Sequence, residues 1–225
     1  MADFFGWEGG WVGANDNEPF RKFLESRSKY KKRQKKYYLH RASYHEAGHA
    51  VIAALQGAVI NSVVISESDA TGRTSVMFEI PKFLKRKSDP EVEIKKIFKK
   101  RLEVHLAGLV AEDIKFGKAI FAGGRTDLRN FHIEVGGLLR TPATGSQVLE
   151  ARKYYWKVCH QHLQENWEWV ERVAGKLLHH KCLSHEEVKG CRPSQVVDSR
   201  EEPLAKVISV DFSNKNRIFY DDIIA

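Results

Sequence analysis

The stretch His45-Glu46-Ala47-Gly48-His49 reads H-E-x-x-H and decides how the rest of the chain is interpreted. On an α-helix, residues i and i+4 lie on one face, about 6 Å apart along the axis. Two imidazoles at this spacing can bind one ion, and zinc accepts neutral histidine nitrogens. Glu46 is placed to take a proton from a water rather than to bind the metal. The pattern is typical of metal-assisted hydrolysis of an amide bond.

The residues around the motif favour its placement on a helix that spans about 41–56. Apolar side chains recur there at helical spacing, namely at Ala47, Ala50, Val51, Ala54 and Leu55. Gly48 costs about 1 kcal/mol relative to alanine inside a helix, which indicates a close packing partner. The alternative is two histidines with incidental spacing, since the chain contains 10 histidines.

Hydrophobic patterning predicts an α+β protein that is mainly helical. Two strands, 58–66 and 74–80, are expected to form a hairpin around a turn at 69–72. Pro81 suits the end of an edge strand, and an edge can accept an extended peptide as an added strand. Helical spacing predicts helices at about 18–39, 41–56, 89–117 and 126–139, one long or two short helices within 146–180, and a short helix from 184.

Length and composition favour one well-buried domain of an intracellular protein. The 225 residues are 42% hydrophobic, and no stretch is apolar enough to span a bilayer. The first residues show neither the basic leader nor the apolar core of a secretory signal. Three cysteines, Cys159, Cys182 and Cys191, cannot all pair within one chain. We therefore expect free thiols and a cytoplasmic location.

The chain is basic, with a net charge of +8 and a pI of about 9.3. Much of this charge lies in a run at 27–36, with tyrosines interleaved, and a second basic run follows at 82–87. Cations with aromatic residues can bind nucleic acid. A solvated helix face is the commoner explanation of such a run, so nucleic acid is not the favoured partner and no residue is assigned to it.

Three motifs in order resemble the peptidase domain of FtsH-type ATP-dependent membrane proteases. Residues 43–51 look like the zinc helix of that family. Residues 107–117, AGLVAEDIKFG, are similar to its G-R-x-A-E-E-x-x-F/Y-G helix, and residues 122–128, AGGRTDL, to its T-G-A-x-x-D-I/L element. Residues 74–81 look like its substrate-side edge strand. The resemblance covers roughly residues 41–190.

The resemblance implies a zincin-like fold: the H-E-x-x-H helix, a small β-hairpin and a C-terminal helical bundle. It implies Zn²⁺ as cofactor, with His45, His49 and Asp127 as ligands and Glu46 as general base. Alternative third ligands are Glu103, Glu112 and Asp113. The residues expected to bind substrate along the edge strand are Val76, Met77, Phe78 and Glu79.

The chain departs from the family ahead of the peptidase region, where about 40 residues stand in place of membrane helices and an ATPase. We expect a basic N-terminal arm at 1–40, a peptidase domain at 41–192 and a tail at 193–225. The predicted function is a zinc-dependent metalloendopeptidase without its own ATPase, acting on peptides or on unfolded or exposed protein segments. A separate ATPase partner and a homo-oligomer stay open. The rivals are a non-catalytic zinc-binding adaptor and a nucleic-acid-binding module.

Overall fold

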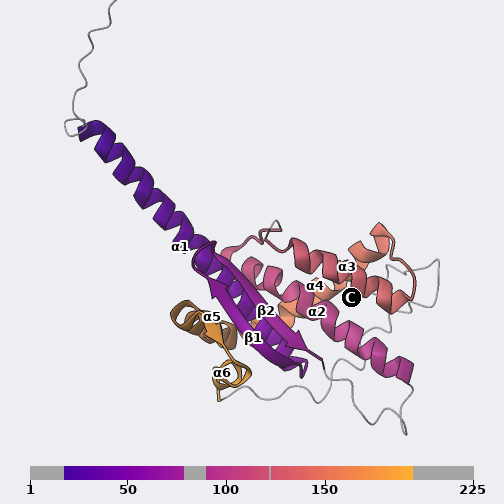
Figure 1. Cartoon of the computed structure of the whole chain (residues 1–225). Coiled ribbons are helices and arrows are strands. Elements are labelled where there is room, and N and C mark those ends of the chain that lie inside the picture. The colour runs from indigo at the N-terminus through magenta and orange to yellow at the C-terminus, as the bar shows by residue number, and fades with distance from the viewer. Residues whose placement is uncertain (1–17, 79–89, 122, 195–225) are drawn as a thin grey trace, which may run out of the picture.

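The computed structural model describes residues 18–78, 90–121 and 123–194, which form a mainly helical α+β structure with one small antiparallel sheet (Figure 1). This confirms the fold class expected from the sequence. The elements in chain order are α1 (Glu18–Leu55), β1 (Val59–Ser66), β2 (Thr71–Met77), α2 (Pro90–Phe116), α3 (Arg125–Leu139), α4 (Gly145–Glu165), α5 (Trp167–His180), β3 (Cys182–Leu183) and α6 (His185–Gly190).

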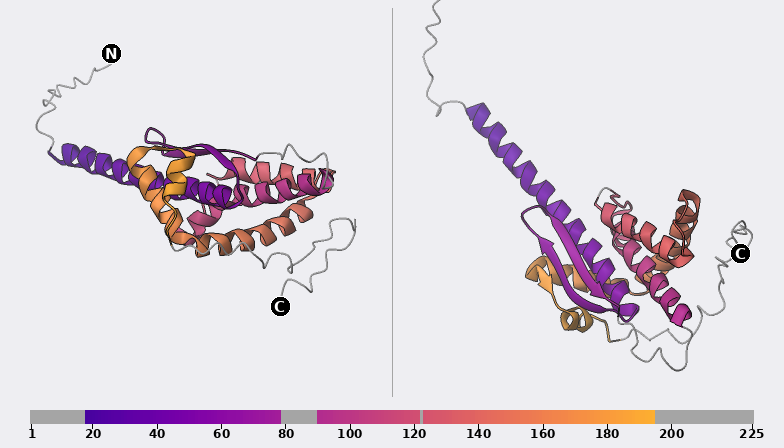
Figure 2. Two further views of the ribbon diagram at one scale, coloured as in Figure 1. Left: turned by 90° about the horizontal axis from the view of Figure 1, so that it is seen from below. Right: turned by 45° about the vertical axis from the view of Figure 1, so that its right-hand side comes forward.

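Helix α1 is a single helix of 38 residues, where the sequence predicted two helices, at about 18–39 and 41–56. The predicted break between them is wrong, because no helix-breaking residue lies between Pro19 and Gly48. The N-terminal part of α1 projects away from the body of the molecule (Figures 1 and 2). From Arg41 onward the helix is largely buried, and this part carries the H-E-x-x-H motif.

The buried part of α1 is the centre of the fold. Helix α2, helix α5 and the β1–β2 hairpin all pack against it. Helices α3 and α4 pack in turn on α2 (Figure 1). The apolar stripe predicted for the motif helix faces this core, and Ala47, Ala50 and Val51 have no exposed surface. Burial from several sides therefore holds the two motif histidines in the interior.

The sheet has the strand order β2-β1-β3, with every pair antiparallel. Strand β2 is thus an edge strand, as predicted. It begins three residues earlier than expected, because the turn occupies 67–70 and Ala70 adopts a φ of 55° that ends it there. The predicted end of this strand, including Glu79 and Pro81, lies outside the described residues.

The two long helices that follow the site pack mainly on different neighbours rather than on each other. Helix α4 packs on α2, and α5 packs on α1. Helix α4 begins at a capping box between Thr144 and Gln147. Of the predicted tail, only residues 193 and 194 belong to the described part of the chain. Among the helices of the described ranges, none combines the length and the apolar content needed to cross a bilayer.

Gly48 sets the distance between α1 and α2. A Cβ atom at this position would lie 2.5 Å from the Ala107 carbonyl oxygen and 2.6 Å from Ala111 Cβ. Both contacts are far shorter than van der Waals distances, and both partners belong to the rigid neighbouring helix. The close packing partner that the glycine predicted is thus α2.

Substituting Gly48 by alanine should therefore destabilise the fold, even though alanine is the better helix former. Forcing the two helices apart costs about 1–3 kcal/mol, more than the roughly 1 kcal/mol gained from helix propensity. Gly175→Ala in α5 is the matched control, since nothing lies within 4 Å of its added Cβ. Thermal unfolding should show a lower Tm for Gly48→Ala and an unchanged or higher Tm for Gly175→Ala.

Candidate metal centre

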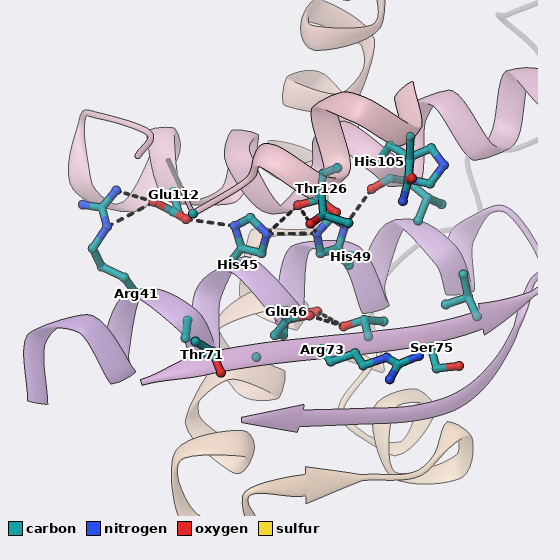
Figure 3. A pocket seen from close by; sticks show the side chains of 18 of the residues that line it. Arg41, His45, Glu46, His49, Thr71, Arg73, Ser75, His105, Glu112 and Thr126 are labelled. Carbon is teal, nitrogen blue, oxygen red and sulfur yellow. Dashed lines mark hydrogen bonds and ion pairs between the residues drawn. The ribbon is translucent and has the colours of Figure 1, made fainter. Parts of the chain in front are cut away.

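His45 and His49 of α1 lie side by side (Figure 3), and Asp127, from a distant part of the chain, contacts both of them. His45 Nε2 lies 3.1 Å from His49 Nε2 and 3.1 Å from Asp127 Oδ2, and His49 Nε2 lies 3.6 Å from the same carboxylate oxygen. Zinc with bonds of about 2.05 Å and tetrahedral angles would hold its ligand atoms about 3.3 Å apart. The three atoms therefore already have the spacing of three corners of a zinc tetrahedron.

Asp127 reaches the histidines from the first turn of α3. Phe131 lies one turn further along the same face of this helix and is fully buried. The apolar anchor therefore orients the first turn of α3 toward α1, so that Asp127 lies beside the two imidazoles. Among the described residues, His45, His49 and Asp127 form the one group of three such side chains close enough to hold an ion together.

Hydrogen bonds on the far side of each imidazole fix the orientation of the ring. His49 Nδ1 lies 2.7 Å from the Val104 carbonyl oxygen, which can only accept, so this nitrogen donates its hydrogen. His45 Nδ1 lies 2.8 Å from Glu112 Oε1 and donates in the same way. In the neutral rings both Nε2 lone pairs then point at each other and at the Asp127 carboxylate. A metal ion or a proton at this position would relieve the repulsion between these atoms.

Gly108 of α2 keeps the space at the two ring nitrogens open. A Cβ atom there would lie 2.5 Å from Nε2 of both His45 and His49. Any larger residue would fill the position next to the donor atoms. The residues present therefore fit a divalent cation in their spacing, in their donor chemistry and in the room left beside them.

The electrostatics of the cluster are those of a cation site. Burial lowers the pKa of His45, but hydrogen bonds to Asp127 and Glu112 outweigh burial and raise this pKa to about 10. Burial likewise lowers the pKa of His49, and the Asp127 charge raises it above the ordinary value. Burial raises the pKa of Asp127, whereas the two histidines bring it well below its usual range. Without a metal, protons supply the positive charge that the carboxylates demand.

Glu112, one of the alternative third ligands, has a different place in the structure. Its carboxylate accepts from His45 Nδ1, from the Arg41 guanidinium and from the backbone N–H of Ile120. It therefore lies behind the imidazole, on the side away from Asp127, and orients His45 as carboxylates behind metal-bound histidines do. Glu103 binds Gln56 and His162 instead. No contact in the described structure joins Asp113 to either motif histidine.

Glu46 points to the other side of α1, toward β2 (Figure 3). Thr74 Oγ1 donates to Glu46 Oε2 at 2.7 Å. Gly72 lies so close that an added Cβ would meet the Glu46 Cγ at 2.4 Å, so strand β2 approaches the carboxylate without a side chain between them. The Glu46 residue is 5% exposed. Its carboxylate is thus held in one position, at the wall of the space that also contains the histidine cluster.

A cleft of about 1080 Å³ contains the cluster and Glu46, and its walls are α1, α2, the start of α3 and strand β2. Every residue from Ala70 to Phe78 lines it, so the edge strand borders the cleft along its whole length. Of the residues predicted to bind substrate, Val76, Met77 and Phe78 lie in this wall. Glu79 lies outside the described residues.

Two residues of the site escaped the sequence analysis. Arg41 and Thr74 hold Glu112 and Glu46, the two carboxylates that serve the motif. Arg41 lies four residues before His45, which places it one turn away on the same helix face. The role of Arg41 could therefore have been predicted from its spacing to His45. The contact of Thr74 with Glu46 could not, because it depends on how the hairpin folds over α1.

Comparison with known proteins adds no family. No protein-family model and no curated protein matches this chain. The resemblance to FtsH-type peptidases therefore stays a prediction from the three sequence motifs.

If Glu112 orients His45, Glu112→Gln should weaken zinc binding by about 10- to 100-fold, because loss of an orienting carboxylate behind a metal-bound histidine has this effect. Asp127→Asn should weaken it more, since it removes a charged ligand. Glu103→Gln is the matched control, as it changes a buried α2 carboxylate that binds another histidine. Titration with a zinc-chelating dye measures all three. Equal loss in the control would contradict the assigned roles.

The raised pKa of His45 predicts a pH dependence of the metal-free protein. Its pKa is 6.5 in the unfolded chain and about 10 in the fold, so the bound proton stabilises the fold fully below pH 6.5. That stabilisation is lost as the pH rises toward 10, and zinc, which must displace the proton, binds more tightly over the same range. Melting curves from about pH 6.5 to 9 should show a falling Tm without zinc and a growing zinc-induced increase. His45→Gln should flatten both trends.

Proposed function

We propose that this protein is a zinc-dependent metalloendopeptidase that hydrolyses peptide bonds in peptides and in unfolded or exposed protein segments. The observation that carries the proposal is the meeting, in one cleft, of the His45–His49–Asp127 cluster, a fixed Glu46 carboxylate and an edge strand. A site that only held a metal for structure would have no use for Glu46 or for an open cleft. The resemblance to FtsH-type peptidase motifs supports the same activity.

The chain's own residues have separate tasks in this proposal. His45, His49 and Asp127 would hold a zinc ion, which would polarise the scissile carbonyl and lower the pKa of the attacking water. Glu46 accepts a proton from that water and returns it to the amine of the leaving group. Thr74 keeps the carboxylate of Glu46 in position for both transfers.

Strand β2 is the proposed binding site for the substrate. An extended peptide added antiparallel or parallel to this edge would run along the cleft past Glu46. Backbone hydrogen bonds to the strand would fix the peptide, and side chains near Val76, Met77 and Phe78 would select its sequence. The cleft follows the strand from Ala70 to Phe78, so it has room for an extended segment laid along the edge.

The nature of the edge limits the substrates. Only a chain segment that can extend will add to a sheet edge, so in this proposal the isolated chain does not cleave the folded core of a protein. A separate ATPase that unfolds proteins, or a ring of several copies, would widen the range. The non-catalytic adaptor is the rival that the following experiment removes.

Glu46→Gln should keep the metal and lose the activity, because glutamine matches the shape of the side chain but cannot accept the proton. General-base catalysis contributes about 10²- to 10⁴-fold, so cleavage should fall by at least 100-fold. Wild type and variant, both loaded with zinc, would be incubated with a denatured protein mixture, and new termini would be counted by mass spectrometry. Equal metal content is the control. Undiminished cleavage by the variant, in preparations free of contaminating protease, would falsify the role of Glu46.

A further inference from the structure

The N-terminal part of α1, residues 18–40, is here called the arm, and its outer part stands clear of the body (Figures 1 and 2). Every side chain described between Leu24 and Tyr38 is exposed. At 1.5 Å per residue the arm is about 35 Å long. Tertiary packing supplies most of the stability of helices in proteins. A long exposed helix thus offers a surface that a partner can cover.

The positive charge of the protein is concentrated in the arm. Residues 18–40 contain nine lysines and arginines and two glutamates, a net charge of +7, and the whole chain has +8. The remaining 202 residues are therefore nearly neutral. A charge that served only solubility would be distributed over the surface, whereas a charge collected in one projecting helix is suited to a polyanion.

Six of the eight residues in the range 29–36 are lysine or arginine, and none is acidic. This gives one positive charge per roughly 2 Å of helix, close to the one negative charge per about 1.7 Å of duplex DNA. At about 100° per residue, the six cations cover some 200° of the helix circumference. We propose that the arm is a nucleic-acid-binding element that recognises the phosphate backbone.

Tyrosines complete this surface. Tyr30 is 62% exposed, and Tyr37 and Tyr38 are 47% exposed. Tyr30 and Tyr37 lie two turns apart on one face, beside the arc of cations. The Tyr37 ring packs on Phe116 and Tyr38, so Tyr30 is the ring best placed to stack on a base or sugar of a single strand, while the neighbouring lysines and arginine contact phosphates.

Two other occupants fit the arm less well. A second copy of the arm would bring two helices of charge +7 together, which costs free energy. A membrane-surface helix buries a face of leucine, phenylalanine or tryptophan. The arm has leucine and phenylalanine at Phe20, Phe23, Leu24 and Leu39, all outside the run of cations, and residues 29–36 contain no leucine, phenylalanine or tryptophan. The charge density and the ring faces together favour a polyphosphate chain over a lipid surface.

The arm and the cleft belong to one helix, and this gives the binding a consequence. Tyr38 lies seven residues, about two helical turns, before His45 on α1. Both Tyr38 and Arg41 line the cleft. Nucleic acid bound to the arm would therefore hold the cleft next to proteins that share the same strand. This consequence for substrate choice rests on the proposed peptidase activity, whereas the binding itself does not.

The test is fluorescence anisotropy of the full-length protein with labelled duplex DNA and single-stranded RNA, each about 20 nucleotides long. With six phosphates neutralised, the slope of log K against log salt should be about −5 on duplex DNA, a loss of about 1000-fold between 50 and 200 mM salt. Replacing the six cations by glutamine should abolish binding and its salt dependence. Tyr30→Ala should weaken single-strand binding by about 10-fold, and Tyr30→Phe should restore it.

The matched control replaces six exposed cations of the body by glutamine, namely Lys95, Lys96, Lys99, Arg129, Lys157 and Lys189, which removes the same charge. This variant should bind as the wild type does. Equal loss in both variants would reduce the effect to net charge and overturn the proposal. Sedimentation with vesicles of phosphatidylcholine and phosphatidylserine is the remaining comparison: binding to vesicles without binding to nucleic acid would also overturn it. Cleavage of denatured protein, measured in parallel, reports separately on the peptidase.

Discussion

The close approach of α1 and α2 is the constraint on which the rest of the structure depends. Gly48 brings the backbone of one helix against Ala107 and Ala111 of the other, and Gly108 leaves room for two imidazole rings in the same interface. Because the two helices touch without side chains at these points, the histidines of α1 lie within reach of Val104 and Glu112 on α2. A wider separation would lose both hydrogen bonds and, with them, the orientation of the rings.

Burial makes this geometry stringent, because an unpaired charge in the core is costly. The Glu112 carboxylate meets the demand by accepting from an imidazole, a guanidinium and a backbone N–H of Ile120. It thereby joins three parts of the chain: α1, α2 and the segment that leads to α3. The Asp127 carboxylate faces the two imidazoles, and their mutual contact raises the pKa of both histidines and lowers that of Asp127. A proton on an imidazole can therefore balance the buried carboxylate, and a metal ion could take the place of that proton.

Features of the fold and site that depend on contacts close in sequence could be predicted, whereas those that depend on contacts between distant residues could not. The motif helix followed from local spacing, since His45, His49 and the apolar stripe all repeat with the helical period. Asp127 is 78 residues from His49, and only the resemblance of a short motif pointed to it. The turn before β2 was predicted at 69–72 and lies at 67–70. Ala70 ends it with a positive φ, a conformation that is rare for alanine and that the sequence gives no reason to expect. The continuity of α1 past residue 40 was readable in the absence of any breaker, but the change in composition there suggested a boundary. Thr74 depends wholly on the hairpin lying across α1.

The apolar anchors of the site make the fold independent of metal. Helix α3 is held to the core by Phe131 and Val135, and α2 by Leu102 and Leu106, none of which donates an atom to the cluster. In zinc fingers, by contrast, the free energy of metal binding is spent on folding, and chelation unfolds the domain. If this site takes up a metal ion, as we propose, the ion can enter and leave without unfolding the chain. Its occupancy is then set by the concentrations of free metal and of protons.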